Sequence, residues 1–502
     1  MNTQHTLAAA AAAAHRFGLG EPDLAVVGAD PQAWLLAQIG PAEPQRGDGL
    51  VRGTQGLARL GQLLQAQRQT VMGDAAMTAS PTAGPSAATS AAPSAAVVAP
   101  SPAPATGAAG PEPLRQIAQA DARARVATAV ASSAPFNERL ALFWANHFTV
   151  SQAKANARGV AGAFEREAIR PHIAGRFVDL LGAVLRHGGM LRYLDNDRSA
   201  GPDSAFVRRQ LRRPADTGPR TTGLNENLAR ELLELHTLGV AGGGAAYGGW
   251  GGYAQADVTA LAALLTGWRV PPLRDLADAP PDAPSAIFDA SWHQPGPKTV
   301  LGQRHAEGPE ALDAVLQQLA RHPSTARFIS AKLARHLVAD DPPPALVARL
   351  EASFRQTDGD LPSLYRTLLQ TPEAWAPQPA KLKTPEEFVI STARLLRLGG
   401  SPLLRQADGA IAQLGQRVQA APSPAGWPDR ADDWLGPDAV WKRVEWATRV
   451  AERAGALVDA RALAAASLGP RLQADTARQI ARAADGRQAL ALLLLAPEFQ
   501  RR

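Results

Sequence analysis

Apolar side chains recur every three or four residues along most of the chain, the spacing that gathers them on one face of an α-helix. Residues 138–148 show it most clearly, with Phe143, Trp144 and His147 on a shared face. By this criterion, helices are predicted at residues 8–17, 31–39, 138–148, 164–185, 225–238, 257–268, 309–321, 324–338, 343–356, 361–369, 385–398 and 439–454, with three more before the end of the chain.

Patterns typical of strands are scarce. Alternating runs rich in Val and Ile are few, whereas alanine, a strong helix former, makes up much of the apolar 45% of the chain. Residues 271–302 are rich in Pro and Asp and are predicted to form an ordered loop or a short hairpin. The pattern therefore predicts a mainly α-helical protein, a large multi-helical domain with little or no sheet.

One boundary is plain in the composition. Residues 74–113 are almost entirely Ala, Pro, Ser, Thr and Gly, which cannot bury enough apolar surface to offset the entropy of ordering. We predict a disordered insertion there. Residues 1–73 are predicted to form a helical segment that packs on the main helical domain, residues 114–502.

Composition also narrows the chemistry. The chain has no cysteine, which excludes disulfides, thiolate metal sites and cysteine nucleophiles. The net charge of +6 is small for 502 residues, and the densest basic patch, residues 208–213, is interpreted as a solvated loop. We therefore expect no nucleic-acid partner.

The sequence offers no membrane segment. No run of about 18 residues is apolar enough to span a bilayer, and the alanine run near the start follows no Lys or Arg, as a secretory signal would require. The expected location is the cytoplasm, with export left open.

The first candidate site lies in the predicted helix at 225–238. Asn227, Glu231 and Glu234 lie on one side of this helix, and Arg230 stands beside them. Two carboxylates one turn apart repel each other, so Arg230 or a metal ion must compensate them. One interpretation is an acid–base pair or a set of oxygen ligands for a divalent cation. The other is a solvent-facing helix with ion pairs four residues apart. The pattern leaves both open, because Glu231 and Asn227 border the buried face.

Other polar residues could share a pocket with Glu231. His147 follows Asn146 on an apolar, aromatic face, where a histidine is more often part of the core. Beside a buried carboxylate, it would instead be a base or a metal ligand. Asp257 occupies the position of a helix N-cap. His293 lies in the long loop, either as a functional residue or as part of an aromatic anchor.

No stretch matches a strong catalytic motif. Several short blocks nevertheless follow one another along the chain in a specific order. They are HRFG (15–18), FWANHF (143–148), MLRYLDN (190–196), NENLARELLEL (225–235), 253–258, TGW (266–268), 293–298, KTPEE (383–387), LGQ (414–416) and GWP (426–428). Together they resemble the bacterial family called domain of unknown function 1800, over nearly the whole chain outside the low-complexity segment.

The resemblance implies a large bacterial protein with no assigned reaction. Genes of this family often neighbour a gene for a sulfatase- or phosphatase-like protein, and many members carry export signals. From the start of this sequence we expect no such signal. It also has Ala145 where the resemblance implies a polar residue, so that a site using this position would lack one ligand.

Two functional hypotheses follow. The first is an enzyme whose reaction the sequence does not select, with hydrolytic chemistry as the first expectation, in which Glu231 is the acid–base group or metal ligand, His147 its partner and Arg230 the positive charge. Its cofactor is unknown, with a divalent metal possible. The second is a non-catalytic helical scaffold or accessory subunit for the product of a neighbouring gene. An open pocket where Glu231, His147 and His293 meet favours the enzyme, whereas groups hydrogen-bonded to the backbone and closed to water favour the scaffold.

Overall fold

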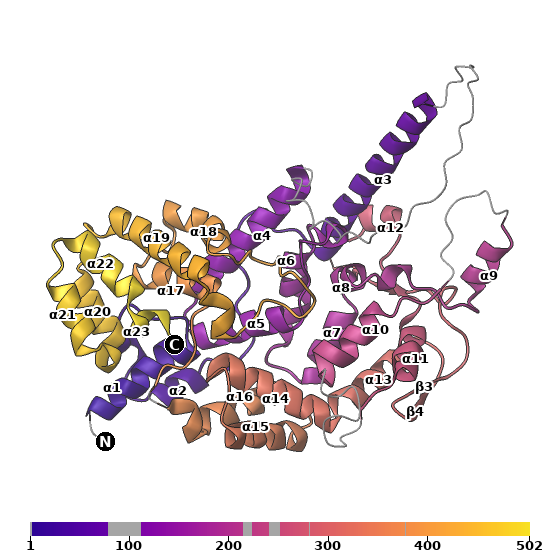
Figure 1. Cartoon of the computed structure of the whole chain (residues 1–502). Helices are drawn as coiled ribbons and strands as arrows, with labels where there is room; N and C mark the ends of the chain where they lie inside the picture. Colours follow the sequence, from indigo (N-terminus) through magenta and orange to yellow (C-terminus); the bar gives the residue numbers. More distant parts are fainter. Residues whose placement is uncertain (1–2, 79–111, 214–222, 240–251, 281, 377) are drawn as a thin grey trace, which may run out of the picture.

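The computed structural model describes residues 3–78, 112–213, 223–239, 252–280, 282–376 and 378–502. Helices make up most of this part of the chain, and two small sheets lie among them (Figure 1). The prediction of a mainly α-helical protein with little sheet is confirmed.

The helices of the first half are α1 (Thr3–Ala12), η1 (Ala13–Phe17), η2 (Leu24–Val27), α2 (Pro31–Leu36), α3 (Gly53–Thr78), α4 (Glu112–Ala131), α5 (Pro135–His147), η3 (Ala155–Ala157), α6 (Ala161–Phe164), η4 (Glu165–Ile169), η5 (Arg170–His172), α7 (Phe177–Leu185), α8 (Gly188–Tyr193), η6 (Asn196–Arg198), α9 (Ala205–Leu211), α10 (Asn227–Glu231) and η8 (Leu232–Thr237).

The helices of the second half are α11 (Gln255–Leu265), α12 (Leu273–Ala277), α13 (Glu310–Ala320), α14 (Pro323–Leu337), α15 (Pro344–Gln356), α16 (Leu361–Gln370), η11 (Pro372–Trp375), α17 (Pro385–Leu395), η12 (Pro402–Gln406), α18 (Ala407–Gln413), η13 (Ala431–Trp434), α19 (Pro437–Ala454), α20 (Ala460–Leu468), η14 (Gly469–Arg471), α21 (Ala474–Ala481), α22 (Gly486–Leu495) and α23 (Pro497–Gln500).

Both sheets are antiparallel pairs near the long loop. Strand β1 (Trp268–Arg269) pairs with β2 (Ile287–Phe288), with Trp268 opposite Phe288. Strands β3 (Lys298–Val300) and β4 (Gln303–His305) form a hairpin, with Lys298 opposite His305. The hairpin agrees with the expectation for residues 271–302.

Two local expectations were wrong, and the helices α3 and α4 were not predicted. The long helix predicted at 164–185 is broken into η4, η5 and α7, because Pro171 lacks the backbone donor that a continuous helix needs. The basic patch is not a loop, since Arg208 and Arg209 lie in helix α9. Helix α4 was not predicted, because its alanine-rich sequence directly follows the low-complexity segment.

The predicted insertion at 74–113 lies largely outside the described residues. At its start, helix α3 continues to Thr78, and at its end, α4 begins at Glu112. The N-terminal helices pack on distant parts of the chain, α1 on η14 and α2 on α16.

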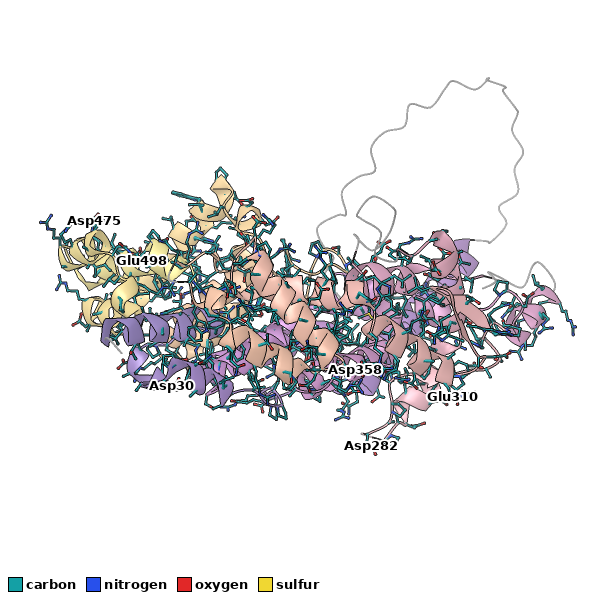
Figure 2. All side chains as sticks on the ribbon, turned by 90° about the horizontal axis from the view of Figure 1, so that it is seen from below. Asp30, Asp282, Glu310, Asp358, Asp475 and Glu498 are labelled. Atoms are coloured by element: carbon teal, nitrogen blue, oxygen red, sulfur yellow. The ribbon has the colours of Figure 1, made fainter. Side chains whose placement is uncertain are left out.

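Two large apolar clusters and two small ones form the core of the described residues. One large cluster surrounds Trp144, Phe148 and Phe177, and the other gathers the C-terminal helices around Phe388 and Trp446. The molecule is elongated, with the C-terminal helices at one end (Figure 1). The view from below agrees, with Asp475 and Glu498 at that end and Glu310 toward the other (Figure 2). No helix within the described residues is long and apolar enough to cross a membrane.

Three π-helical turns interrupt the regular helices within the described residues. They are η1, η4 and η8, and they carry the buried polar residues His15, Glu165 and His236. The predicted helix at 225–238 is thus α10 followed by η8, and Gly239 follows it with a φ of +82°, the left-handed conformation in which glycine commonly ends a helix. Single π-turns are uncommon and occur frequently at functional sites.

Helices α19 and α22 meet through two glycines. Gly455 ends α19 and Gly486 begins α22, and a Cβ on Gly486 would lie within 3.0 Å of the Gly455 carbonyl oxygen. The two helices therefore approach more closely than any pair of larger residues would permit.

Replacing Gly486 by alanine is expected to lower the free energy of unfolding by about 1–3 kcal/mol, because the new methyl group forces the two helices apart. Thermal unfolding of the two proteins measures the change. Gly409→Ala is the matched control, because a Cβ at this helical position meets no atom within 4 Å. The control should unfold at the same or a slightly higher temperature. Equal destabilisation of both variants would contradict the close contact.

Candidate functional site

Arg230 is paired with carboxylates of its own helical segment. Its guanidinium lies 3.3 Å from Glu226 and 3.7 Å from Glu234, both four residues away, and it donates to the Gln255 side chain at 3.1 Å. These are the ion pairs expected of a solvent-facing helix. Each contributes only a few tenths of a kcal/mol, because the side chains are partly exposed.

Glu231 is half-buried beside this ion-pair row. Burial, and then the charge of Glu234, raise the pKa of Glu231 above its ordinary value. Burial and the nearby Glu231 carboxylate in turn raise the pKa of Tyr193 to about 12. Asn227 is exposed at the start of α10, although the apolar register placed it at the edge of the buried face.

His147 belongs to the aromatic core. Its ring packs against Trp144, Phe148 and Phe328, and its Nε2 lies 3.2 Å from the backbone oxygen of His236. Its Nδ1 has no hydrogen-bond partner. Burial, and then the charge of Lys332, hold the pKa of His147 well below its ordinary value, so the ring is neutral.

Asp257 and His293 have structural partners. Asp257 lies in the first turn of α11, not at its N-cap, and its carboxylate accepts from the backbone N–H groups of Ala254 (2.8 Å) and Leu301 (2.7 Å). His293 Nδ1 donates to the Thr266 carbonyl at 2.7 Å, and its Nε2 accepts from Lys298 at 2.9 Å. Both residues thereby anchor the long loop and its hairpin to α11.

The predicted residues therefore do not form one pocket. Among the described residues, no contact joins Glu231 to His147 or to His293. Of the predicted set, only Asn146 lines the polar cavity described next. Within the described chain, no group of three or more His, Asp or Glu side chains is arranged to hold a metal ion.

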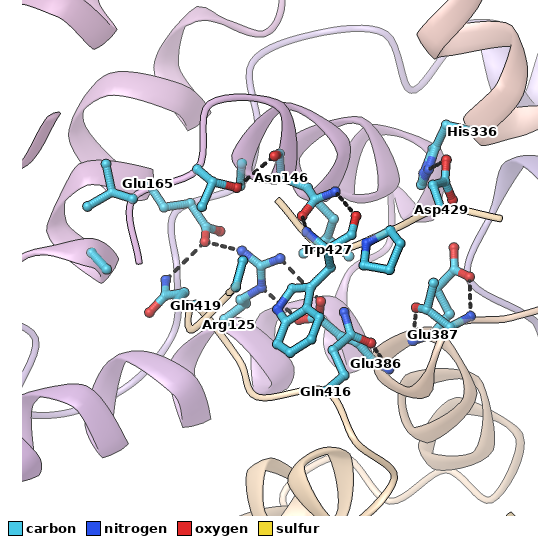
Figure 3. Close-up of a pocket in the computed structure, with 18 of the residues that line it drawn as sticks. Arg125, Asn146, Glu165, His336, Glu386, Glu387, Gln416, Gln419, Trp427 and Asp429 are labelled. Carbon is cyan, nitrogen blue, oxygen red and sulfur yellow. Dashed lines mark hydrogen bonds and ion pairs between the residues drawn. The ribbon is translucent and has the colours of Figure 1, made fainter. Parts of the chain in front are cut away.

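A polar cavity lies where α4, α5 and η4 meet the segments around α17 (Figure 3). About 70 Å³ of it can hold water, which is room for a few molecules at roughly 10–15 Å³ each. Its walls combine residues of both large apolar clusters with charged groups. The polar lining residues are Arg125, Arg139, Asn146, Thr149, Glu165, His336, Thr384, Glu386, Glu387, Gln416, Gln419, Trp427 and Asp429.

Arg125 from α4 joins two carboxylates in the cavity wall. It is paired with Glu165 of η4, and it contacts both oxygens of Glu386 at 2.7 and 3.3 Å. All three side chains are almost fully buried. Burial raises the pKa of Glu165, but the charges of Arg125 and Arg170 outweigh it, so the net pKa is lowered.

A second group of ion pairs surrounds Glu387. This carboxylate is paired with Arg139 of α5 and lies 2.9 Å from Arg502, and its other oxygen accepts from the backbone N–H of Thr384 at 2.9 Å. Burial alone would raise the pKa of Glu387. The charges of Arg502 and Arg139 outweigh burial and hold the pKa well below its usual range.

His336 and Asp429 form a hydrogen-bonded pair in the same wall. His336 Nδ1 lies 3.0 Å from Asp429 Oδ2, and His336 Nε2 is buried without a hydrogen-bond partner. Burial outweighs Asp429 and lowers the pKa of His336, so the ring is neutral at neutral pH. Burial raises the pKa of Asp429, but His336, Lys381 and Arg502 outweigh it and bring the pKa to about 2. An ionised carboxylate only accepts, so Nδ1 carries the proton and Nε2 keeps its lone pair.

Asn146 fixes the loop that closes the cavity. Its side-chain amide donates to the Trp427 carbonyl at 2.9 Å and accepts from the Trp427 backbone N–H at 2.8 Å. Ala145, where the resemblance implied a polar residue, also lines the cavity.

Sequence reasoning missed most of this site. Some of its lining residues, Asn146, Glu386 and Trp427 among them, lie in the FWANHF, KTPEE, LGQ and GWP blocks, so the order of these blocks in the resemblance was a signal for part of the site. Arg125, Glu165 and His336 lie outside every block. No local pattern distinguishes them from ordinary charged helix residues.

Acidification should destabilise the protein through its buried histidines. Burial lowers the pKa of His236 to about 3, whereas an unfolded histidine titrates near 6.5. Below pH 6.5 the unfolded chain therefore binds more protons, and stability falls as the pH falls. Each such histidine contributes about 1 kcal/mol per pH unit.

The predicted loss of stability is tested by measuring the unfolding temperatures of wild type and His236→Leu between pH 7.5 and 5. The leucine removes no hydrogen bond, because neither ring nitrogen of His236 has a partner. The variant should lose less stability on acidification, and the comparison cancels the contribution of every other group. Identical pH profiles would show that His236 does not titrate in this way.

The comparisons with known proteins give one match. The family described as a protein of unknown function (DUF1800) matches residues 12–501. Neither a curated protein nor a solved structure matches the chain. Since the match spans nearly the whole chain, including all four blocks that line the cavity, this protein belongs to the DUF1800 family.

Proposed function

We propose that the protein is a hydrolytic enzyme that uses His336 as its general base in the polar cavity. The observation that carries the proposal is the His336–Asp429 pair. It combines a neutral imidazole, a free and buried Nε2, and an ionised carboxylate that orients the ring. A neutral imidazole with a free lone pair can act as a general base, and a carboxylate at its other ring nitrogen holds the tautomer that this role needs.

Each group has a definite role. His336 Nε2 takes a proton from a water molecule as that water attacks the substrate. Asp429 keeps the Nδ1 proton in place and stabilises the imidazolium that results. The imidazolium then returns its proton to the leaving group. Asn146 positions the Trp427 loop, and it contacts neither reacting atom in this scheme.

The size and charge of the cavity limit the substrate. Space for a few water molecules admits the reacting group of a substrate but not a whole molecule, so the remainder lies outside. The walls hold four carboxylates, those of Glu165, Glu386, Glu387 and Asp429. Arg125 and Arg139 line the same walls. Arg502 pairs with Glu387 and Lys381 with Asp429, although neither of these two cations lines the cavity. Because the negative and positive charges around the cavity offset each other, the cavity favours a substrate whose reacting group is uncharged, such as an ester, an amide or a glycoside.

A second candidate is the non-catalytic scaffold or accessory subunit. The observation that favours it is the pairing of the buried charges, because Arg125, Arg139, Glu386 and Glu387 all have partners inside the protein. His147 and His293 are likewise bonded to the backbone. Networks of this kind rigidify a core whether or not it catalyses a reaction.

Replacing His336 by glutamine should lower kcat/KM for hydrolysis by about 100-fold or more, because the base is lost. Asp429→Asn should have a similar effect, since an amide no longer favours the required tautomer. The full-length protein is assayed with p-nitrophenyl acetate, leucine p-nitroanilide and p-nitrophenyl glycosides.

His305→Gln is the matched control. His305 is also buried and hydrogen-bonded to a polar side chain, Gln318 at 2.8 Å, but it lies outside the cavity. Its activity and unfolding temperature should stay near those of wild type. If hydrolysis is unchanged in His336→Gln, this histidine is not the base. If no substrate is turned over and both cavity variants unfold at lower temperature, the scaffold is the better description.

A further inference from the structure

A second hollow lies in the C-terminal end of the molecule, apart from the polar cavity. Helices α17, α18 and α19 form its walls, and they lie together in Figure 1. Its volume is about 500 Å³, which falls within the range of about 300–1,000 Å³ that small-molecule sites occupy. It shares no lining residue with the polar cavity.

The walls of this hollow are mostly apolar. Trp446 from α19 is almost fully buried, and its ring packs edge-on against Phe388 at 4.9 Å between centroids. The apolar lining residues are Val389, Ala393, Leu396, Leu398, Leu404, Ala407, Ala410, Trp446, Val450 and Ala454. A surface of this kind gains free energy by covering an apolar ligand.

One wall residue has an unsatisfied polar group. Thr392 of α17 is 2% exposed and lines the hollow, and its hydroxyl has no hydrogen-bond partner. A threonine inside a helix usually bonds to a backbone carbonyl of the preceding turn. An unpaired buried hydroxyl costs about 1–3 kcal/mol, so the apolar wall beside the hollow holds a polar group that the protein itself does not satisfy.

Two arginines stand on the same wall. Arg449 and Arg453 are one turn apart on α19, and both line the hollow. Arg449 donates to Gln413 at 3.0 Å and lies 4.0 Å from Glu445, at the outer limit of an ion pair, and both of these charged side chains are about half exposed. Arg453 is exposed and forms no ion pair with any residue in the described part of the chain. An apolar hollow with positive charge beside it matches a ligand with an apolar tail and an anionic head.

We propose that this hollow binds a medium-chain fatty carboxylate. The alkyl tail lies against Leu396 and Trp446, and the carboxylate lies between the guanidinium groups of Arg449 and Arg453. Arginine suits this role because its planar donors match a carboxylate in two parallel hydrogen bonds. The proposal does not depend on hydrolysis in the polar cavity.

Calorimetric titration of the full-length protein with decanoate tests the proposal. We expect one molecule to bind per chain, and decanol, which has the same tail without the charge, to bind at least about tenfold more weakly. In Arg449→Gln/Arg453→Gln, the affinity for decanoate should fall by a similar factor. Each tenfold loss corresponds to about 1.4 kcal/mol.

A matched control separates the two arginines from general surface charge. Arg482→Gln/Arg487→Gln changes the net charge equally at exposed positions outside the hollow. This control should bind decanoate as wild type does. Gly409→Phe, in contrast, places a ring at a lining position where an added Cβ meets no atom within 4 Å, so the variant should fold and should lose binding.

Each alternative result would overturn the proposal. Equal affinity for decanoate and decanol, or unchanged binding in the double arginine variant, would exclude recognition of the carboxylate. Absence of binding to wild type would exclude this ligand class. A concentration-dependent dimer on size-exclusion chromatography that Gly409→Phe abolishes would show that a second copy of the chain covers the hollow instead.

Discussion

The fold depends on burying charge in pairs. Arg125 joins α4, η4 and α17, and Arg139 joins α5 to the start of α17, so the helices that enclose the cavity are connected through carboxylates. Taking such groups out of water costs several kcal/mol for each ion, and good pairing offsets the cost only when every partner is present. The pairs therefore add less to stability than to specificity, because any other packing of these helices leaves a buried charge without its partner.

The π-turns show how the backbone adapts to these charges. Glu165 begins η4, and its carboxylate is held by Arg125, Arg170 and Gln419. In a regular α-helix, the side chains after Glu165 would point in different directions from those they take in the π-helical turn η4. The irregular turn brings the glutamate to the cavity while Ile169, at the end of the same turn, remains in the apolar core. The same combination of polar residue and apolar core recurs at His15 and His236.

Helical periodicity predicted the fold class and most helices, because that signal is local and extends over many residues. It failed at Pro171 and at α4, where a single residue or an alanine-rich composition decides. The candidate site was predicted less well. Glu231 was chosen because its neighbours along one helix suggested chemistry, yet the cavity is built by residues such as Arg125 and Glu386, which no local pattern connects. The order of the blocks pointed to Glu386 and Asn146, but it did not include Arg125 or His336, and it assigned a role to no residue.

The separation of these partners along the sequence has a consequence for synthesis. Arg125 and Glu386 are 261 positions apart, and Arg139 and Glu387 are 248 apart. A chain emerging from the ribosome thus carries Arg125 and Arg139 long before Glu386 and Glu387 exist, although Glu165 follows Arg125 by only 40 positions. Contacts of such range form late and slowly. During that interval α4 and α5 must keep their charged faces in water, so the cavity is among the last parts of the molecule to close.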